Sequence, residues 1–597
     1  MRHLRQLLRF AVPYWKRSAL ALLLLIALVM LDLSIPRLIQ SIIDQGILRQ
    51  DKSVVIRNSA LMLGISFLSV FIAIGNNNLS VSVGESVARD VRDAIFVKIQ
   101  SFSYGDLDRQ NTGQLLVRLT SDTSAIQRVL QLSLRIGTRA PLLMLGSLVL
   151  MITTSPALAL TLLPLLLFTT LVIGFFLVKM EPMFRAVQRR LDRLNTVLQE
   201  NVAGIRLVKA FVRDRYESQR FDLSNQAYTD ESVKVMQFAS FMSPLLTLCV
   251  NGGMVIVIWA GGLQAAHGDL STGQIVAFIN YLLTTMAPLL MMTILSNVWA
   301  SGIASAKRIE EVLNVVPEIR DAPDAVRLQV TGAPRITFEA VSFSYQGARS
   351  DAVLNDVSFV AEPGQTVAIL GATGAGKSTL VKLIPRFYDV TAGRVLLDGT
   401  DVRSISQDSL LAQIGIVPQE TVLFSGTIRD NIRYGRPEAS DADVIRAARA
   451  AQADEFIERM PEGYDSRVEQ RGRNFSGGQR QRLAIARALL LEPKVLILDD
   501  STSAVDVETE TRIQRALAAE HPSQTRIIVA QRISTVLQAD DILVIDEGRL
   551  VARGRHAELM KSSPVYREIY ASQLGTGSAA AQDAPELGAE GDARVRA

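Results

Sequence analysis

A glycine-rich segment in the second half of the chain has the clearest chemical meaning. It follows the buried-strand pattern Thr366–Leu370 and precedes the apolar helix start Leu380-Val381. In this context its glycines let backbone N–H groups surround a phosphate. Lys377 then supplies charge to the β- and γ-oxygens, and the Ser378 hydroxyl can bind magnesium. The residues that we expect to bind ATP are Gly371, Ala372, Thr373, Gly374, Ala375, Gly376, Lys377, Ser378 and Thr379.

A second strand pattern predicts a carboxylate for the same site. Val495–Asp499 is a run of four apolar residues that ends in an acidic one. In phosphate-loop enzymes a carboxylate at this place holds magnesium, so we assign Asp499 to the metal together with Ser378. From about Arg335 onward, apolar runs have strand length and glycines separate them, which is typical of an α/β domain.

The first half of the chain has a different texture. The 597 residues are 48% hydrophobic and 20% charged, with a mean hydropathy of +0.23. This balance excludes a disordered chain, and the net charge of +4 is too small to predict nucleic-acid binding. Several charge-free intervals exceed the ~20 residues that a membrane-spanning helix needs. The six predicted spans are about 18–40, 58–83, 138–155, 157–178, 240–265 and 273–300.

Lys and Arg residues predict the orientation of these spans. The N-terminal segment 1–17 is basic, and so are the long connections between spans 2 and 3 and between spans 4 and 5. We therefore expect a multi-pass protein of the cytoplasmic (inner) membrane with both termini in the cytoplasm. The two long connections contain few helix breakers and repeat apolar residues at helical spacing. They are predicted to extend the spans as helices, and solvated loops are the alternative.

Polar residues inside the spans are candidates for substrate contact. Asp32 lies in span 1, and Asn76, Asn77 and Asn78 lie in span 2. These side chains could face a substrate cavity, bond to neighbouring helices or line a water-filled vestibule. The sequence leaves the three alternatives open.

A further motif points to a family. Asn474–Arg482 reads Asn-Phe-Ser-Gly-Gly-Gln-Arg-Gln-Arg and lies between the phosphate loop and the Asp499 strand. With six spans and long cytoplasmic extensions, this order resembles a half-transporter of the ATP-binding cassette (ABC) exporter family, over about residues 1–570. Asn111–Asp122 and Gly204–Phe211 also resemble these exporters. The resemblance implies an all-α six-helix transmembrane domain fused to an α/β phosphate-loop ABC nucleotide-binding domain.

The resemblance also implies roles for individual residues. Tyr345 would stack on adenine, and Gln419 would contact magnesium and sense the membrane domain. The signature residues would close on the γ-phosphate of ATP held by a second half-transporter, and Asp506 would join the two sites across that interface. The segments near 102–123 and 211–222 would dock on the ATPase domains. The signature residues are Ser476, Gly477, Gly478 and Gln479.

Two positions depart from the family pattern. These exporters usually have a Glu after the magnesium Asp, where this chain has Asp500, and a His at the later switch position, where it has Gln531. A side chain one methylene shorter withdraws the base from the attacking water, and Gln takes up no proton. The pair resembles the degenerate site of a heterodimeric exporter, which binds ATP and hydrolyses it slowly. A homodimer is the alternative.

The sequence thus predicts an ATPase that exports lipophilic or amphipathic, multidrug-type substrates by alternating access, with membrane lipids and a second half-transporter as partners. The alternatives are a homodimeric lipid or peptide exporter and a nucleotide-gated channel or regulatory subunit. The expected organisation is a cytoplasmic N-terminal segment 1–17, a transmembrane domain 18–305, a linker 306–335, an ATP-binding domain 336–573 and a disordered tail 574–597.

Overall fold

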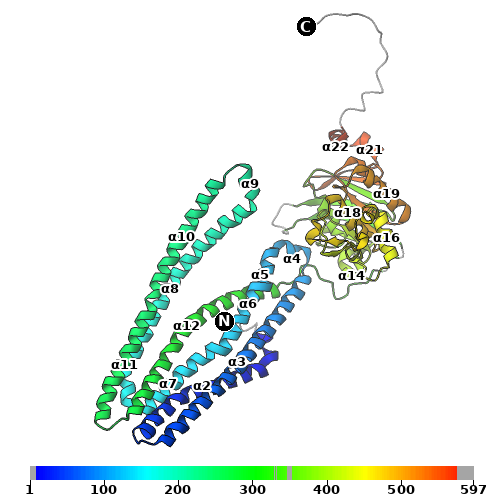
Figure 1. Cartoon of the computed structure of the whole chain (residues 1–597). Coiled ribbons are helices and arrows are strands. Elements are labelled where there is room, and N and C mark those ends of the chain that lie inside the picture. Colours follow the sequence, from blue (N-terminus) through cyan, green and yellow to red (C-terminus); the bar gives the residue numbers. More distant parts are fainter. Residues whose placement is uncertain (1–7, 329, 331, 346–351, 575–597) are drawn as a thin grey trace, which may run out of the picture. The chain divides into compact units, whose positions relative to one another are not determined.

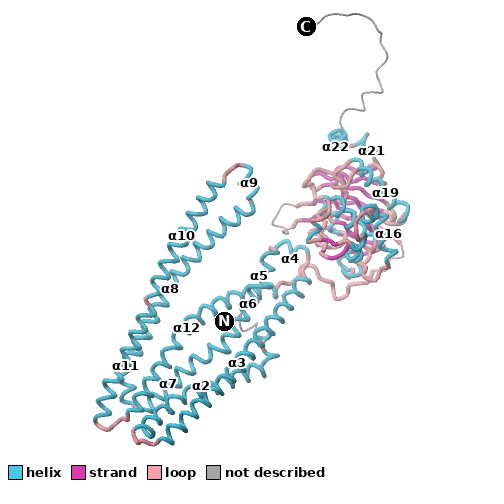
Figure 2. Tube along the Cα trace, viewed as in Figure 1, coloured by secondary structure: helices cyan, strands magenta, loops and turns pink. Residues whose placement is uncertain are grey.

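The computed structural model describes residues 8–328, 330, 332–345 and 352–574, and it divides into two compact units. Unit 1 comprises residues 1–100 and 112–315, and unit 2 comprises residues 101–111 and 316–597. Strands occur in unit 2, whereas the described part of unit 1 is helical (Figure 2). Apart from Leu574, the predicted tail lies outside the described residues.

Unit 1 is a set of long helices that run back and forth along one direction (Figure 1). Ser155 ends one of them and caps the next, because its hydroxyl accepts a hydrogen bond from the Leu158 amide at 3.2 Å and Pro156 follows it. The predicted boundary between the spans 138–155 and 157–178 is therefore confirmed. The principal helices are α2 (Trp15–Ser41), α3 (Lys52–Gln100), α5 (Thr112–Val117), α6 (Thr123–Leu132), α7 (Thr138–Thr154), α8 (Pro156–Ala203), α9 (Ile205–Ala210), α10 (Asp214–Ser240), α11 (Met242–Ala266) and α12 (Thr272–Leu313).

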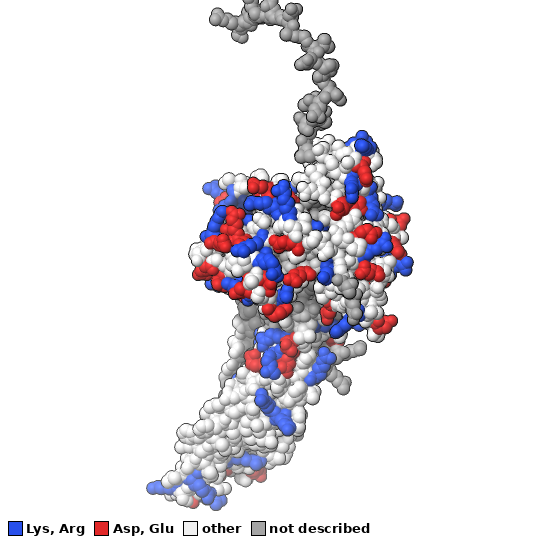
Figure 3. Space-filling model, turned by 90° about the vertical axis from the view of Figure 1, so that its right-hand side faces the viewer, with Lys and Arg blue, Asp and Glu red and all other residues white. Residues whose placement is uncertain are grey.

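Five helical segments among the described residues are long and apolar enough to cross a membrane, with mean hydropathies of 1.6 to 2.5. They contain the first five predicted spans. The sixth predicted span falls in α12, where several side chains lie outside the described set, and it stays a prediction. In the view of Figure 3, these helices present a broad surface with few charged side chains.

The two long connections are helical, as predicted, since α3 continues to Gln100 and α8 to Ala203. The helix α12 also continues, into the first residues of the predicted linker, and ends only at Leu313. The buried carboxylate of Asp122 explains this extension, because it accepts hydrogen bonds from Ser305 and Arg308 and so anchors the last turns of α12. A polar contact between distant segments thus prolongs a helix past its apolar stretch.

Unit 2 contains a mixed six-stranded sheet with the order β12-β11-β3-β10-β9-β6, and a four-stranded sheet with the order β2-β1-β4-β5. Neighbours from β11 to β6 run parallel, so the carboxyl ends of β3, β10, β9 and β6 share one edge. The central strands β9 and β10 are buried along their whole length, and β3 is buried after Thr366, which matches their apolar sequences. The strands are β1 (Ile336–Phe343), β2 (Leu354–Ala361), β3 (Thr366–Leu370), β4 (Ala392–Leu397), β5 (Thr400–Asp401), β6 (Ile414–Val417), β9 (Val495–Asp499), β10 (Thr525–Val529), β11 (Asp541–Asp546) and β12 (Arg549–Gly554).

A short helix that lies between α3 and α5 in the sequence packs with unit 2. This helix is α4 (Tyr104–Arg109), and its first ring stacks on Phe387 with centroids 4.0 Å apart. The Tyr388 hydroxyl also donates a hydrogen bond to Asp108. The capping box formed by Ser103 and Asp106 holds the helix in shape. Segment 101–111 therefore belongs structurally to the second unit.

We predict that Tyr104→Ala loosens α4. Loss of the stacked ring costs roughly 0.5–1.5 kcal/mol beyond the lost burial, so amide exchange across Gly105–Arg109 should accelerate about tenfold. Hydrogen-exchange mass spectrometry of the purified chain measures this. Tyr104→Phe retains the ring and should exchange like the wild type. Equal exchange in the Ala variant and the wild type would contradict a docking role for the ring.

Candidate active site

The candidate site lies where the parallel strands of unit 2 end. The phosphate loop follows β3, Gln419 follows β6, Asp499 and Asp500 end β9, and Gln531 follows β10. Because these strands are neighbours with their carboxyl ends at one edge, residues that are more than 150 positions apart in the chain converge. The sequence-predicted loop, metal carboxylate and switch residue are thus brought together.

The phosphate loop is hydrogen-bonded to the side chain of its own lysine. Gly376 adopts a φ of +97° and begins α13 (Lys377–Leu383), and a Cβ there would lie 2.9 Å from the Val353 carbonyl oxygen. Glycine is therefore required at this turn. The Lys377 ammonium donates to the carbonyls of Gly371 and Ala372, at 2.8 Å each. Burial lowers its pKa, and the nearby carboxylates oppose that shift.

The two residues predicted to hold magnesium touch each other. The Ser378 hydroxyl donates to Asp499 Oδ1 at 2.7 Å. Burial raises the pKa of Asp499, and the bond from Ser378 opposes this shift. A hydroxyl beside a desolvated carboxylate is an oxygen-only donor set of the kind that Mg²⁺ prefers, and a bound dication would offset the cost of burying the charge. The residues present therefore fit the metal.

Asp500 accepts two amide donors on a single carboxylate oxygen. Gln531 Nε2 donates to Asp500 Oδ2 at 2.8 Å, and Gln419 Nε2 donates to the same atom at 3.2 Å. The backbone of Asp500 has a φ of +49°, a left-handed conformation that Asp tolerates better than most residues. Burial raises the pKa of this carboxyl. The two residues that depart from the family pattern are therefore directly bonded to each other.

Tyr345 lies beside the phosphate-loop helix. Its hydroxyl is 2.9 Å from the Thr379 hydroxyl. Phe343 and Tyr388 meet its ring edge-on, with centroids 5.0 and 5.3 Å away. The side chain is 44% exposed, so a fixed aromatic ring is presented next to the loop. This geometry is compatible with stacking on a base.

The signature residues begin the helix α18 (Gly477–Leu489). Ser476 and Gln479 form a capping box, in which the Ser476 hydroxyl accepts from the Gln479 amide and the Gln479 side chain accepts from the Ser476 amide. A Cβ on Gly478 would lie 2.7 Å from the Ala504 carbonyl oxygen, so only glycine lets this helix approach the loop before Asp506 so closely. Among the described residues, the amides of Gly477 and Gly478 have no hydrogen-bond partner, so these two N–H groups stay available to an anion.

Among the described residues, no hydrogen bond joins the signature residues to the phosphate loop of the same chain. Gln481 instead ties α18 to the loop before α19 (Val507–Glu520), through Ser503 and the Ala504 amide, at 3.2 and 3.0 Å. Asp506 caps α19 by accepting from the Thr509 amide at 2.9 Å. The signature residues and Asp506 therefore form one surface that is separate from the loop.

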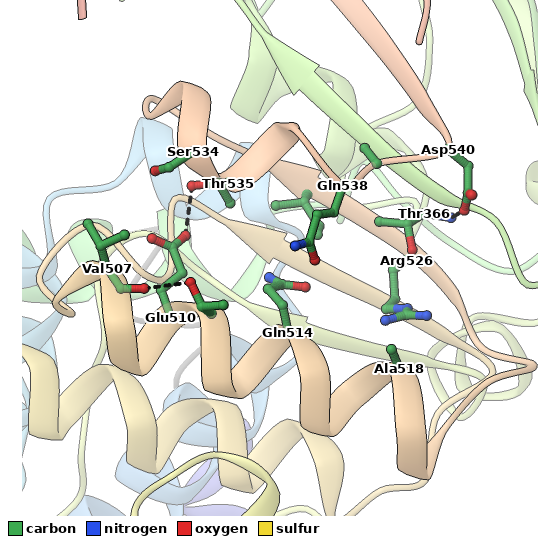
Figure 4. A pocket seen from close by; sticks show the side chains of 13 residues that line it. Thr366, Val507, Glu510, Gln514, Ala518, Arg526, Ser534, Thr535, Gln538 and Asp540 are labelled. Atoms are coloured by element: carbon green, nitrogen blue, oxygen red, sulfur yellow. Dashed lines mark hydrogen bonds between the residues drawn. The ribbon is translucent and has the colours of Figure 1, made fainter. Parts of the chain in front are cut away.

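Sequence reasoning missed three residues that support the switch. The Arg532 guanidinium donates to the carbonyls of Ser503 and Val505, at 2.7 and 2.9 Å. The side chain of Glu510, which is 3% exposed, accepts from the hydroxyls of Thr502 and Thr535 at 2.7 Å each, and it borders a cavity of about 250 Å³ (Figure 4).

The third missed residue holds the switch from the C-terminal end. Gln573, in the final described helix α22 (Pro564–Leu574), donates to the Gln531 carbonyl at 2.6 Å and accepts from the Ile533 amide at 2.7 Å. The switch segment Gln531–Ile533 is therefore held by hydrogen bonds to the loop before α19 and to α22. No local sequence pattern marks this support, since Arg, Glu and Gln are residue types common on surfaces and the burial of Glu510 is visible only in the structure.

We predict that Gly478→Ala destabilises the ATPase domain. The added methyl group overpacks the contact with Ala504, which costs about 1–3 kcal/mol and lowers the unfolding midpoint by about 3–9 °C for a domain of this size. Differential scanning calorimetry of the purified chain measures the shift. Gly477→Ala is the matched control, because its Cβ would meet only the Ala504 Cβ, at 3.2 Å. Equal shifts for the two variants would contradict this packing.

We also predict that magnesium-dependent ATP binding weakens on acidification. The raised pKa of Asp499 means that a proton competes with the metal at a higher pH than for an ordinary Asp. Titration of Mg²⁺ against a fluorescent ATP analogue should give a rising half-saturation point as the pH falls from about 7 to about 5. Asp499→Asn should bind Mg²⁺ weakly without this pH dependence, whereas Asp500→Asn should keep it. A pH-independent wild type would contradict the assignment.

Comparison with known proteins agrees with this geometry. Residues 18–289 match the family described as ABC transporter transmembrane region, and residues 354–503 match the family described as ABC transporter. The uncharacterized ABC transporter ATP-binding protein YfiB of Bacillus subtilis is 39% identical over 572 residues, covering 96% of this chain and 99% of the relative. A fatty acid ABC transporter ATP-binding/permease protein of Mycobacterium bovis is 39% identical over 491 residues, covering 82% and 77%.

A solved structure is similar over nearly the whole chain. A bacterial Atm1-family ABC exporter with ATP bound superposes with a TM-score of 0.79 and 29% identity, covering 94% of this chain and 99% of that one. The order of a helical membrane region and a phosphate-loop domain is thus shared along the full length. The chain belongs to the ABC transporter family, has the fold of an ABC exporter half-transporter, and uses ATP and Mg²⁺ as ligands of its ATPase domain.

Proposed function

We propose that this chain is one half of a heterodimeric ABC exporter, and that its own ATP site binds nucleotide but hydrolyses it slowly. The observation that carries the proposal is the pair of amide donors on Asp500 Oδ2, from Gln531 and Gln419. The two lone pairs of this oxygen already accept hydrogen bonds from two amides, so the oxygen is not free to take up a proton from water, although burial raises the pKa of the carboxyl. General-base catalysis needs an acceptor within reach of the water and free to take its proton.

The groups that this chain needs to bind a nucleotide with its metal ion are all present. Tyr345, the phosphate loop with Lys377, and the pair Ser378 and Asp499 together provide stacking, phosphate and metal contacts. When bound, Mg²⁺ neutralises charge on the phosphate oxygens. Lys377 orients the phosphates, and Asp499 holds its charge at the metal position. The slow step is therefore assigned to activation of water at Asp500.

A second half-transporter is required to complete a site. The signature residues from Ser476 onward and Asp506 form a surface separate from this chain's loop, and the amides of Gly477 and Gly478 would donate to the γ-phosphate of a partner-bound nucleotide. In unit 1, α8 and α10 pair with each other as a long arm (Figure 1). The arm exposes large apolar side chains around its tip, which supports burial against a partner: Val202, Leu207, Phe211, Val212 and Leu223.

The proposed transport reaction is export of lipophilic or amphipathic molecules across the cytoplasmic membrane by alternating access, with six spans and cytoplasmic termini. The Mycobacterium bovis relative, named as a fatty acid transporter, supports an amphipathic substrate for this chain. The segments near 102–123 and 211–222 would receive closure of the ATPase domains. The first segment includes α4, and the second joins the tip helix α9 (Ile205–Ala210) to the first turns of α10. The domain limits given above remain part of this proposal.

A nucleotide-gated channel or regulatory subunit is the second candidate. The slow site favours it, because binding without turnover is sufficient for gating. Substrate-dependent ATP turnover in the reconstituted pair would separate the two, since a transporter couples each cycle to substrate and a channel does not.

We predict that Asp500→Glu with Gln531→His accelerates ATP hydrolysis by the purified chain in lipid. The Glu side chain is one methylene longer, and a 1 Å change in the position of a catalytic group is worth about 10²-fold in rate. The double variant should exceed the product of the single rate gains, because both residues act on one transition state. Steady-state ATPase assays measure this. Asp408→Glu, an exposed change outside the site, is the control. A wild-type homodimer that already turns over at the rate of the double variant would overturn the slow-site proposal.

A further inference from the structure

A cavity of about 680 Å³ inside unit 1 contains charged groups that the ATPase site does not use. Its walls come from α2, α3, α7, α12 and the π-helical segment Ser133–Gly137, and most of the lining residues are apolar. The polar residues that line it are Asp32, Asn76, Asn77, Arg135, Thr284 and Arg139. This volume is in the range of small-molecule sites, and ionisable groups among membrane helices mark functional positions.

The charges in this cavity do not balance. Arg139 Nη2 donates to Asp32 Oδ2 at 2.8 Å, which pairs one cation with the one acid. Arg135 also lines the cavity, and no ion pair of Arg135 occurs among the described residues. The cavity therefore carries one uncompensated positive charge. Such a charge between apolar walls is costly, and an anion that enters beside it recovers part of that cost.

The hydrogen-bonding groups in the cavity are also incomplete. Within the described part of the chain, Arg139 Nε and Asn77 Oδ1 are buried without a hydrogen-bond partner. Rotation of the Asn77 amide exchanges its oxygen and nitrogen, so it can present an N–H to the cavity. Asn76 differs, because it donates to the Ala21 carbonyl at 2.8 Å and is 4% exposed, and it therefore fastens α3 to α2. Asn78 is exposed and does not line the cavity.

We propose that this cavity binds the headgroup of an amphipathic anion, with Arg135 as the primary charge contact, the Arg139–Asp32 pair as a second donor, and the apolar walls around the aliphatic chain. The shared chemistry is a single anionic group on a long hydrocarbon, which a carboxylate or a phosphate monoester can supply. This inference rests on the proposed export function for its direction of transport, but binding itself needs neither hydrolysis nor a partner.

The test measures equilibrium binding of radiolabelled palmitate to the full chain in nanodiscs of zwitterionic lipid, with empty nanodiscs subtracted. Arg135→Gln should weaken binding at least tenfold, and Arg135→Lys should retain most of it. Asp32→Asn raises the net charge of the cavity by one and should tighten binding several-fold. Arg189→Gln, which removes an exposed Arg outside the cavity, is the matched control and should bind like the wild type.

Competition then identifies the headgroup. Unlabelled hexadecanol and hexadecyltrimethylammonium should compete at least tenfold more weakly than palmitate, and hexadecyl phosphate shows whether a phosphate replaces the carboxylate. Equal binding by the wild type, Arg135→Gln and Asp32→Asn, or equal competition by the cationic amphiphile, would overturn the inference. Charge-dependent binding without ATP-driven transport would leave the inference standing and contradict export. ATP-driven transport of the amphiphile at an unchanged rate in Arg135→Gln and Asp32→Asn would leave export standing and contradict the inference.

Discussion

The ATPase site depends on the carboxylate oxygen Asp500 Oδ2, which is held by two amides from neighbouring strand ends. The strand order places β6 and β10 on either side of β9, so Gln419 and Gln531 reach the same atom from opposite sides. A carboxylate oxygen that accepts hydrogen bonds from two fixed amides is held in place, and its two lone pairs are already occupied. The two departures from the family pattern are thus a single structural feature, and the neighbouring Asp499 stays with Ser378.

The residues around the Asp500–Gln531 hydrogen bond also contact the signature helix and the loop before Asp506, which form the surface proposed to meet a partner. Arg532, next to Gln531, binds the carbonyls of the loop before Asp506, and Gln481 ties the signature helix to the same loop. Gln573 fixes the switch from the other end. A change at the Asp500–Gln531 bond is therefore linked by contiguous hydrogen bonds to the residues that would complete the partner's site. In the proposed heterodimer, the chain would keep that surface ordered while its own site turns over slowly.

The sequence predicted the parts of this arrangement that are local. The loop from Gly371 to Thr379 and the Asp499 strand were predictable because each is a short motif between a strand and its connection. The bond from Gln531 to Asp500 joins residues 31 positions apart, and the support from Gln573 comes from a further helix, so neither has a local pattern. The continuation of α12 to Leu313 was missed for a similar reason, because Asp122 anchors it from a distant segment.

The most direct test of the slow site is the state of the nucleotide occluded in this chain during turnover of the pair. The assembled complex is incubated with Mg²⁺ and a photoreactive ATP that carries the label on its γ-phosphate, quenched and cross-linked, and the two subunits are separated. The account predicts that label remains on this chain after many turnovers, whereas the partner loses it. Loss of the γ-label from both chains at the same rate would show that Asp500 activates water despite its two amide bonds, and it would contradict the account.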